Sequence, residues 1–402
     1  METGRIGRRI AYWRERRGFT QTDFGRLMGQ TKRWVQDLEG GKRQVDPRLS
    51  VLVRAAEVLR IPLEQLLMDS PASPPPETTP PAEAVAVIDV LYRTEDGERP
   101  PPLADLRRAL AFCCVAFQAC HYGALGRDLP ALLLNAQRAA DLETEAGEAH
   151  ALLSRTLQLT ASFLHKYGSS TAVPAALVAD RALSAAERSG DAVAIGAASR
   201  RVAKALAYQG RPEAARDFAV SAARRLQEDL AAAGPLGLST LGMLYLSAAI
   251  SSAASERSTA AVARATSLVD HAGEVAEQQG VDLNEDWTAF GPTNVGLHRV
   301  DVLARFEDGW SALEAAEGVD AAALAGLTRE RKAQHLITMA RAQLLTRRKS
   351  EAGKSLLRAD KLAPEEVRRR KSTVDLVADV VGAMPVPSGE LRALAERCGL
   401  RA

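Results

Sequence analysis

The sequence predicts an all-α protein in three parts: a small basic N-terminal domain, a proline-rich linker and a larger body of helical hairpins. Ala and Leu dominate the 402 residues while aromatic residues make up only 4%, a composition that favours helices packed through small side chains. Apolar residues recur at helical spacing, interrupted by Gly or Pro roughly every 15–20 residues. A run of prolines separates the two helical parts.

The proline run sets the predicted domain boundaries. The segment SPASPPPETTPPAEA at 70–84 resists helix and strand and favours an extended spacer. A second proline cluster at 100–102 prolongs the linker, and a short strand or helix at 85–92 is left open. The sequence therefore predicts domains at residues 1–69 and 103–402, joined by a linker at 70–102.

Positive charge is concentrated at the N-terminal end of the chain. Residues 1–70 contain 14 Lys and Arg against 9 Asp and Glu, a net charge of +5, whereas the rest of the chain has a net charge of −3. A basic domain on an otherwise mildly acidic chain is typical of a protein that binds DNA phosphates through that domain.

The segment GFTQTDFGRLMGQTKRWVQDLEGG at 18–41 has the caps and the turn of two short helices. Thr20 is expected to cap the first helix, Gly29 to permit a tight turn, and Thr31 to cap the second helix. Gly25 has no side chain where the two helices are expected to cross. The apolar residues expected to face inward are Phe24, Leu27, Met28, Val35 and Leu38.

This segment resembles the phage-repressor-like, or XRE, helix-turn-helix family. The matching positions are Gly18, Thr20, Gln21, Phe24, Leu27, Gly29, Thr31, Val35, Leu38, Glu39 and Gly41. Downstream, Pro47 precedes a helix with apolar spacing and IPLEQLL closes the domain, so the resemblance covers about residues 5–68 and implies a five-helix domain. Gln30 departs from the family pattern, which usually has an aliphatic residue there.

The resemblance implies that the helix beginning at Lys32 enters the major groove of DNA. Lys32, Arg33 and Asp37 match base-facing positions, with Asp37 either accepting from cytosine or holding Arg33 in place. The predicted base and phosphate contacts are Gln21, Thr31, Lys32, Arg33, Trp34, Gln36, Asp37, Lys42 and Arg43. Longer-range attraction is expected from Arg14, Arg16 and Arg17.

Residues 103–402 are expected to fold as helix pairs. Second helices are predicted to begin near Leu129, Thr171, Pro212, Ser258 and Ser350. Where consecutive starts are clear they lie about 40–46 residues apart, in the range of helical-hairpin repeats. Two hairpins, at 203–226 and 340–364, resemble tetratricopeptide repeats through Ala205, Gly210, Ala214, Phe218 and Ala222, and through Ala342, Ala352, Leu356, Ala359 and Pro364. The sequence thus predicts an α-solenoid.

The segment EDWTAFGPTNVGLHRV at 285–300 is unusual in this aromatic-poor chain, and its FGPTNV part is similar to a segment of XRE–tetratricopeptide regulators of high-GC bacteria. Gly291 and Pro292 break the backbone, and Thr293 is expected to cap a helix beginning at Asn294. A functional interpretation places five side chains on a surface that faces a peptide or small-molecule effector: Trp287, Phe290, Asn294, His298 and Arg299. The structural interpretation is a turn whose aromatic residues fill a gap between repeats.

Other functional classes lack their sequence signatures. No GxSxG, HExxH, P-loop or dinucleotide-binding motif is present, so no enzyme and no cofactor are expected. Cys113, Cys114, Cys120 and Cys398 have no metal-ligand spacing and are expected to act as small buried hydrophobic residues. Because no signal sequence or long apolar run was found, we expect a cytoplasmic, nucleoid-associated protein without a membrane span.

The favoured hypothesis is a DNA-binding transcriptional regulator that responds to an effector. It would bind a palindromic double-stranded operator as a homodimer, because a symmetric protein favours a symmetric site. One alternative is an interaction scaffold whose repeats bind a protein partner. Another is a constitutive repressor whose repeats serve only to dimerise.

Overall fold

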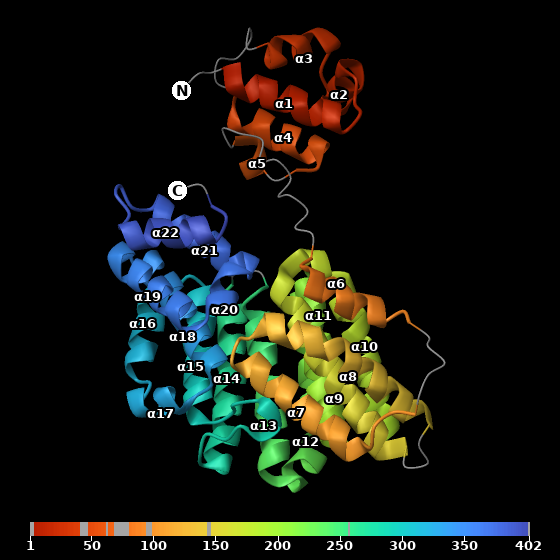
Figure 1. Cartoon of the computed structure of the whole chain (residues 1–402). Helices are drawn as coiled ribbons and strands as arrows, with labels where there is room; N and C mark the ends of the chain where they lie inside the picture. Colours follow the sequence, from red (N-terminus) through yellow and green to blue (C-terminus); the bar gives the residue numbers. More distant parts are fainter. Residues whose placement is uncertain are drawn as a thin grey trace. The chain divides into compact units, whose positions relative to one another are not determined.

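The computed structural model describes residues 4–40, 47–61, 63–67, 80–93, 99–142, 146–255 and 258–400, which are helical nearly throughout, as predicted (Figure 1). Within these residues the only β pairing is one isolated bridge between Leu283 and Phe290. The chain divides into two compact units, Met1–Thr78 and Thr79–Ala402, here called the head and the body. Each is described by itself.

The head contains the five predicted helices. They are α1 (Gly4–Arg16), α2 (Gln21–Met28), α3 (Lys32–Glu39), α4 (Leu49–Leu59) and α5 (Leu63–Leu67). Its core contains fully buried Phe24 and Val35 together with Leu38, and Met28 packs at its edge. The prediction for Leu27 was wrong, because its side chain remains 46% exposed. Leu27 follows Phe24 by three positions in an eight-residue helix, and only one narrow face of so short a helix meets the core.

Two glycines let the head helices approach closely. A Cβ on Gly7 of α1 would lie 2.3 Å from the carbonyl oxygen of Leu38, so α1 crosses the end of α3 backbone to backbone. A Cβ on Gly25 would lie 2.9 Å from the carbonyl oxygen of Gln30. Gly25 therefore allows α2 to contact the turn that follows it, a close approach that the sequence predicted at this residue.

The body is a succession of helices. Its first half contains α6 (Ala82–Val90), α7 (Leu103–Gln118), α8 (Tyr122–Leu142), α9 (Ala146–Leu164), η1 (His165–Thr171), α10 (Ala172–Ser189), α11 (Ala192–Tyr208) and α12 (Pro212–Ala232). Its second half contains α13 (Gly234–Ser252), α14 (Thr259–Gln279), η2 (Glu285–Trp287), α15 (Pro292–Arg305), α16 (Gly309–Glu317), α17 (Ala321–Gly326), α18 (Arg329–Leu345), α19 (Lys349–Leu362), α20 (Pro364–Arg368), α21 (Lys371–Gly382) and α22 (Gly389–Arg397).

Consecutive body helices pack as hairpins, for example α9 with α10, α11 with α12, and α18 with α19 (Figure 1). The predicted starts at Thr171, Pro212, Ser258 and Ser350 agree with the starts of α10, α12, α14 and α19 to within one residue. The prediction at Leu129 was wrong, because α8 begins seven residues earlier and continues through Pro130.

The body begins earlier than the sequence indicated. Helix α6 lies within the predicted linker, yet it packs on α8 and buries Ala84, Val87 and Val90 in the body core. Apolar burial of these three side chains outweighs the proline signals on either side. The proline run itself lies mostly outside the described residues.

Two features of composition are explained by packing. Cys113, Cys114 and Cys120 are buried and unpaired, as predicted.

Helix α13 is long and apolar enough to span a membrane by composition alone, but 67% of its apolar stretch is buried inside the body. It lies between α12 and α14, so its apolar character is accounted for by contacts with these helices.

Candidate functional site

Helices α2 and α3 form two capped helices joined by a tight turn, as the sequence predicted. The hydroxyl of Thr20 accepts from the backbone N–H of Asp23 at 3.1 Å, and the Thr20 N–H donates back to the Asp23 carboxylate at 3.3 Å. Gly29 has φ of 68°, a left-handed conformation that favours glycine. The hydroxyl of Thr31 accepts from the N–H of Trp34 at 3.2 Å and so begins α3.

Helix α3 has a buried face and an exposed face. Val35 and Leu38 point into the head core, whereas Lys32, Arg33 and Gln36 are exposed. Among the described residues neither Lys32 nor Arg33 has a carboxylate within ion-pair distance, so both cations are available to a ligand. Of the other predicted contacts in α3, Trp34 packs partly against the head core and Asp37 is half-buried.

The carboxylate of Glu39 holds the orientation of α3. Arg14 of α1 donates to it from Nε at 2.6 Å and from Nη2 at 3.1 Å, and Gln21 of α2 donates at 2.8 Å. The Arg14 and Glu39 side chains are only 7% and 8% exposed. The hydrogen bond with Glu39 raises the pKa of Arg14, although burial opposes that shift. Glu39 therefore connects all three helices.

This arrangement corrects part of the sequence interpretation. Arg14 was expected to attract DNA at long range, but it is buried and also donates to the carbonyl oxygen of Phe19 at 2.8 Å. Arg17 donates to the backbone carbonyls of Leu59 and Arg60, at 2.9 Å each. Both arginines thus secure the fold. In the sequence, Glu39 is only a position that matches the helix-turn-helix family. The sequence could not show that Arg14, 25 residues away, is the buried partner of Glu39.

Of the predicted phosphate contacts Gln21, Lys42 and Arg43, the structure describes only Gln21. Gln21 is half-buried, and its amide is already engaged with Glu39. Lys42 and Arg43 lie outside the described residues, as does the side chain of Arg16. The predicted role of Lys42 and Arg43 stays a prediction.

In the body, the segment predicted to face an effector folds as a tight loop ending in α15. Phe290 is fully buried against α13, where a Cβ on Gly242 would lie 1.9 Å from its ring. Asn294 is also fully buried; its amide points at the sulfur of Met243, 3.6 Å away, and its Oδ1 has no hydrogen-bond partner. Phe290 and Asn294 thus face the core rather than a shared ligand surface.

The other three residues of that prediction lie apart from one another. Trp287 is half-buried, with the Arg155 guanidinium 5.5 Å from its ring centroid. His298 bonds through Nδ1 to the carbonyl oxygen of Asn294 at 2.8 Å, and burial lowers its pKa to about 4. Arg299 pairs with Asp270 of α14 at 2.7 Å. The five side chains therefore do not form one surface.

The predicted cap at Thr293 was wrong. Helix α15 begins at Pro292, which follows Gly291 in the first helical position. The N–H and hydroxyl of Thr293 instead donate to the Asp282 carboxylate at 3.1 and 2.6 Å. These bonds tie the two ends of the loop together.

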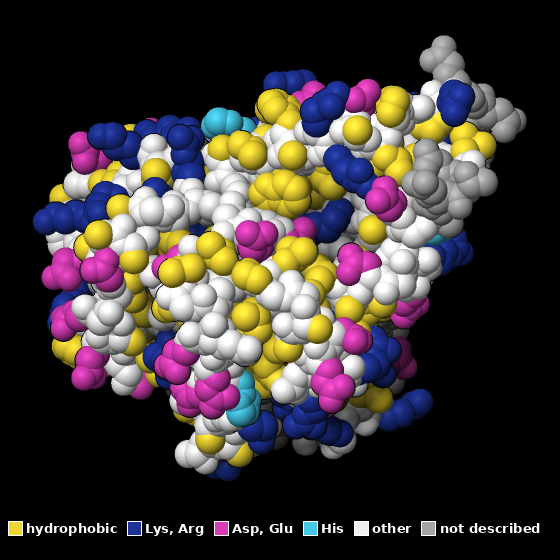
Figure 2. Space-filling model, turned by 90° about the horizontal axis from the view of Figure 1, so that it is seen from below, with side chains coloured by type: hydrophobic (Ala, Val, Ile, Leu, Met, Phe, Trp, Pro, Cys, Tyr) yellow, Lys and Arg dark blue, Asp and Glu magenta, His cyan; other side chains and the backbone are white. Residues whose placement is uncertain are grey.

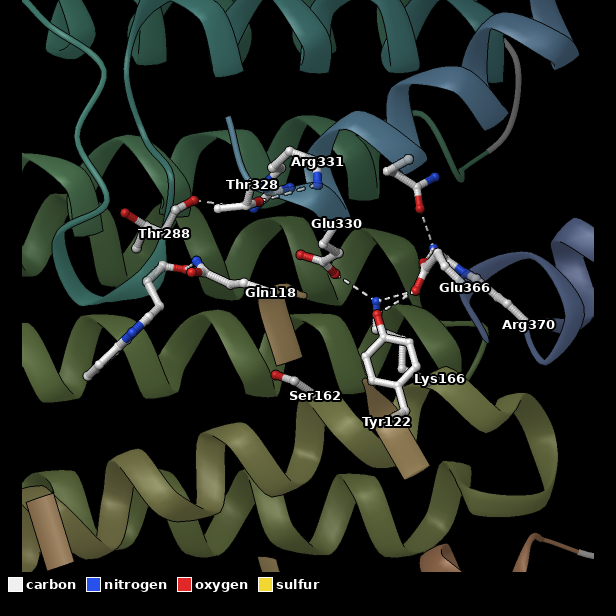
Figure 3. Close-up of polar contacts among 12 residues, drawn as sticks. Gln118, Tyr122, Ser162, Lys166, Thr288, Thr328, Glu330, Arg331, Glu366 and Arg370 are labelled. Carbon is white, nitrogen blue, oxygen red and sulfur yellow. Dashed lines mark hydrogen bonds and ion pairs between the residues drawn. The ribbon is translucent and has the colours of Figure 1, made fainter. Parts of the chain in front are cut away.

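Charged side chains from distant parts of the body meet in its interior (Figure 3). Lys166 lies between Glu330 and Glu366, with Nζ 2.6 and 2.8 Å from their carboxylates. Tyr122 donates to Glu366 at 2.7 Å and Arg370 donates to it at 2.9 Å. Because these contacts join α8 and η1 to α18 and α20, they connect early and late helices of the body.

The charges in this network depend on one another. Glu330 and Glu366 raise the pKa of Lys166, although desolvation by burial opposes the shift. Burial alone would raise the pKa of Glu330, but Lys166 and Arg331 lower it to about 2. The network is thus ionised at neutral pH and stabilises the closed body in that form.

Comparison with known proteins identifies one part of the chain. A family model described as a helix-turn-helix domain matches residues 5–67. No curated protein matches the chain. The head is therefore a helix-turn-helix domain. The match ends at residue 67, before the body begins at Thr79.

Proposed function

We propose that the protein is a sequence-specific DNA-binding transcriptional regulator that reads DNA through α3. The observation that supports this most strongly is two exposed cations, Lys32 and Arg33, on the second helix of a helix-turn-helix domain; neither has a carboxylate of the described residues within ion-pair distance. Arg and Lys donate to guanine O6 and N7 in the major groove, each good contact contributing about 1–3 kcal/mol of discrimination.

The proposal includes a homodimer on a palindromic operator, since two heads related by a twofold axis fit two half-sites one helical turn apart. The body, of tetratricopeptide-like hairpins, binds a peptide or small-molecule effector and biases the arrangement of the heads. The resemblance of residues 5–68 to the XRE family supports the first part, and the polar interior of the body supports the second. The proposal places the protein with the DNA in the cytoplasm and assigns it no catalytic step.

Selection from a random double-stranded DNA library tests sequence-specific binding. Full-length protein at about 0.15 M salt, where non-specific attraction is screened, is expected to enrich a two-fold symmetric motif. Enrichment of no motif would reject sequence-specific binding. An asymmetric motif would reject the symmetric dimer.

Arg33→Ala and Arg43→Ala are expected to weaken binding in different ways. Loss of a base contact at Arg33 should reduce affinity for the selected duplex about tenfold or more and leave scrambled DNA nearly unaffected. Loss of a phosphate contact at Arg43 should weaken both duplexes alike and reduce the salt slope by about 1. Gel shifts with both duplexes at two salt concentrations measure this, and equal losses for the two variants would contradict the division of roles.

A further inference from the structure

Helix α11 carries three cationic side chains toward the interior of the body: Arg200, Arg201 and Lys204. None of the three is fully buried, because each retains a part of its surface. Even so, desolvation by the surrounding protein is the largest influence on all three, lowering the pKa of Arg201 to about 10 and the pKa values of Arg200 and Lys204 well below their usual values. All three are therefore partly exposed groups whose protein surroundings disfavour the charged form.

Further cations surround the three residues on α11. Arg155, Arg331 and Arg370 all act on them electrostatically, as does Lys166. The carboxylates in the same region are Asp286, Glu330 and Glu366. Among the described residues that these interactions name, cations therefore outnumber carboxylates. We call Arg200, Arg201 and Lys204 the cationic cluster.

The three carboxylates are already engaged by other cations. Asp286 pairs with Arg155 at 2.5 Å, Glu330 with Lys166 at 2.6 Å, and Glu366 with both Lys166 and Arg370. Among the described residues, no carboxylate lies within ion-pair distance of the cationic cluster. Arg201 Nε is buried without a hydrogen-bond partner, and Lys204 Nζ only lies 5.9 Å from the ring centroid of Tyr208.

An unpaired charge removed from bulk water is unfavourable unless a counter-charge compensates it. On the face of the molecule drawn in Figure 2, basic and acidic side chains are interspersed, so surface cations have anions and water nearby. The cationic cluster differs, because Asp286 and Glu330 act on it only from beyond ion-pair distance. An anion entering from outside the chain would supply the direct counter-charge that these three cations lack among the described residues.

We propose that the cationic cluster binds the anionic groups of a small ligand, as phosphates or carboxylates. Two neighbouring guanidinium groups can each make paired hydrogen bonds to such groups, and Lys204 adds a third charge one helical turn further along α11. The inference rests on the effector site of the proposed function and gives that effector a chemical class.

The backbone of the loop at 285–300 contacts two of the cations that surround the cluster. Arg155 donates to the carbonyl oxygen of Asp286 at 2.5 Å, and Arg331 donates to that of Thr288 at 3.4 Å. Asp286 and Trp287 both have left-handed φ values, of 49° and 55°, which are unfavourable for residues other than glycine. An anion drawing Arg155 or Arg331 toward the cluster therefore acts on a strained segment.

Isothermal titration of the full chain with pyrophosphate, and separately with citrate, tests the inference without DNA. Chloride at matched ionic strength controls for screening. We expect saturable binding of pyrophosphate, citrate or both, and the stronger of the two identifies the preferred anionic group. If neither pyrophosphate nor citrate gives more heat than chloride, the inference is overturned.

Variants localise the binding. Arg201→Gln and Lys204→Met should each reduce affinity about tenfold or more, while Lys204→Arg, which keeps the charge, should retain binding. The exposed Lys354 on α19 provides a matched control, because Lys354→Gln makes the same change of charge outside the interior. Equal affinity of Lys204→Met and Lys354→Gln would overturn the assignment to α11.

The ligand-free protein gives an independent readout. Removing an unpaired charge should stabilise the body, so Lys204→Met is expected to raise the Tm by about 2–4 °C. A fall in Tm would show that Lys204 is already compensated within the fold and would contradict the inference. Since none of these measurements involves DNA, their failure is distinguishable from failure of DNA binding by the head.

Discussion

Replacing Glu366 by alanine is expected to lower the free energy of unfolding of the body by about 3–5 kcal/mol. Its side chain is fully buried and accepts from Tyr122, Lys166 and Arg370. Removing the carboxylate leaves two cations without that counter-charge and detaches α20 from α8 and η1. Tyr122 and Glu366 are 244 positions apart in the sequence, so loss of their contact separates early helices of the body from late ones.

Differential scanning calorimetry of the full chain, following the transition of the body, measures this change. Glu351→Gln on α19 is the matched control, because that carboxylate is 54% exposed and lies 3.8 Å from Arg348. An exposed pair contributes little, so the control should change stability by no more than about 0.5 kcal/mol. Equal effects of the two variants would contradict a role for Glu366 in closing the body.

Glu39→Ala is expected to destabilise the head by about 3 kcal/mol. The substitution leaves the Arg14 guanidinium buried without its carboxylate and releases the amide of Gln21. Because Glu39 connects α1 and α2 to the end of α3, DNA affinity should fall as well, although Glu39 itself need not contact DNA.

Urea unfolding monitored by tryptophan fluorescence of the head, together with DNA affinity, tests this prediction. Glu57→Gln is the matched control in the same unit, since Glu57 is 58% exposed and pairs with Arg54 on the surface. A Glu39→Ala head as stable as the control would show that the Arg14 ion pair does not hold the helices together.

The head was largely predictable because its signals are local. The caps at Thr20 and Thr31 and the turn at Gly29 each depend on a few adjacent residues, and all three occur in the structure. What the sequence missed depends on contacts between helices. Gly7 approaches the end of α3, and Arg14 pairs with Glu39; both contacts join positions 25 or more residues apart. The spacing of apolar residues within one helix does not indicate such contacts.

In the body, hairpin boundaries were predictable where Gly or Pro marks a turn. Pro212 begins α12, as predicted, and Pro364 begins α20 directly after α19 ends. The start predicted near Leu129 was wrong, because α8 begins at Tyr122 and continues through Pro130. The sequence leaves a strand or helix at 85–92 open and assigns α6 to the linker, because burial against α8, rather than the helix's own pattern, determines that it belongs to the body.

The candidate effector site was harder to predict. Aromatic residues in the loop at 285–300 suggested a ligand surface, but Phe290 completes the core against Gly242. The cationic cluster on α11 was not singled out, because Arg200, Arg201 and Lys204 look like an ordinary solvated face in sequence. Only the folded chain shows that this face turns inward and that its neighbours are already paired.

The central claim, that exposed side chains of α3 read DNA, is tested most directly by the double variant Lys32→Ala, Arg33→Ala. Both side chains lie outside the head core, so the Tm of the variant should match that of the unaltered protein. At about 1–3 kcal/mol for each contact, affinity for the selected duplex should fall by about 30-fold or more, measured by fluorescence anisotropy of the full chain. An unchanged affinity in a folded variant would contradict DNA recognition by this helix.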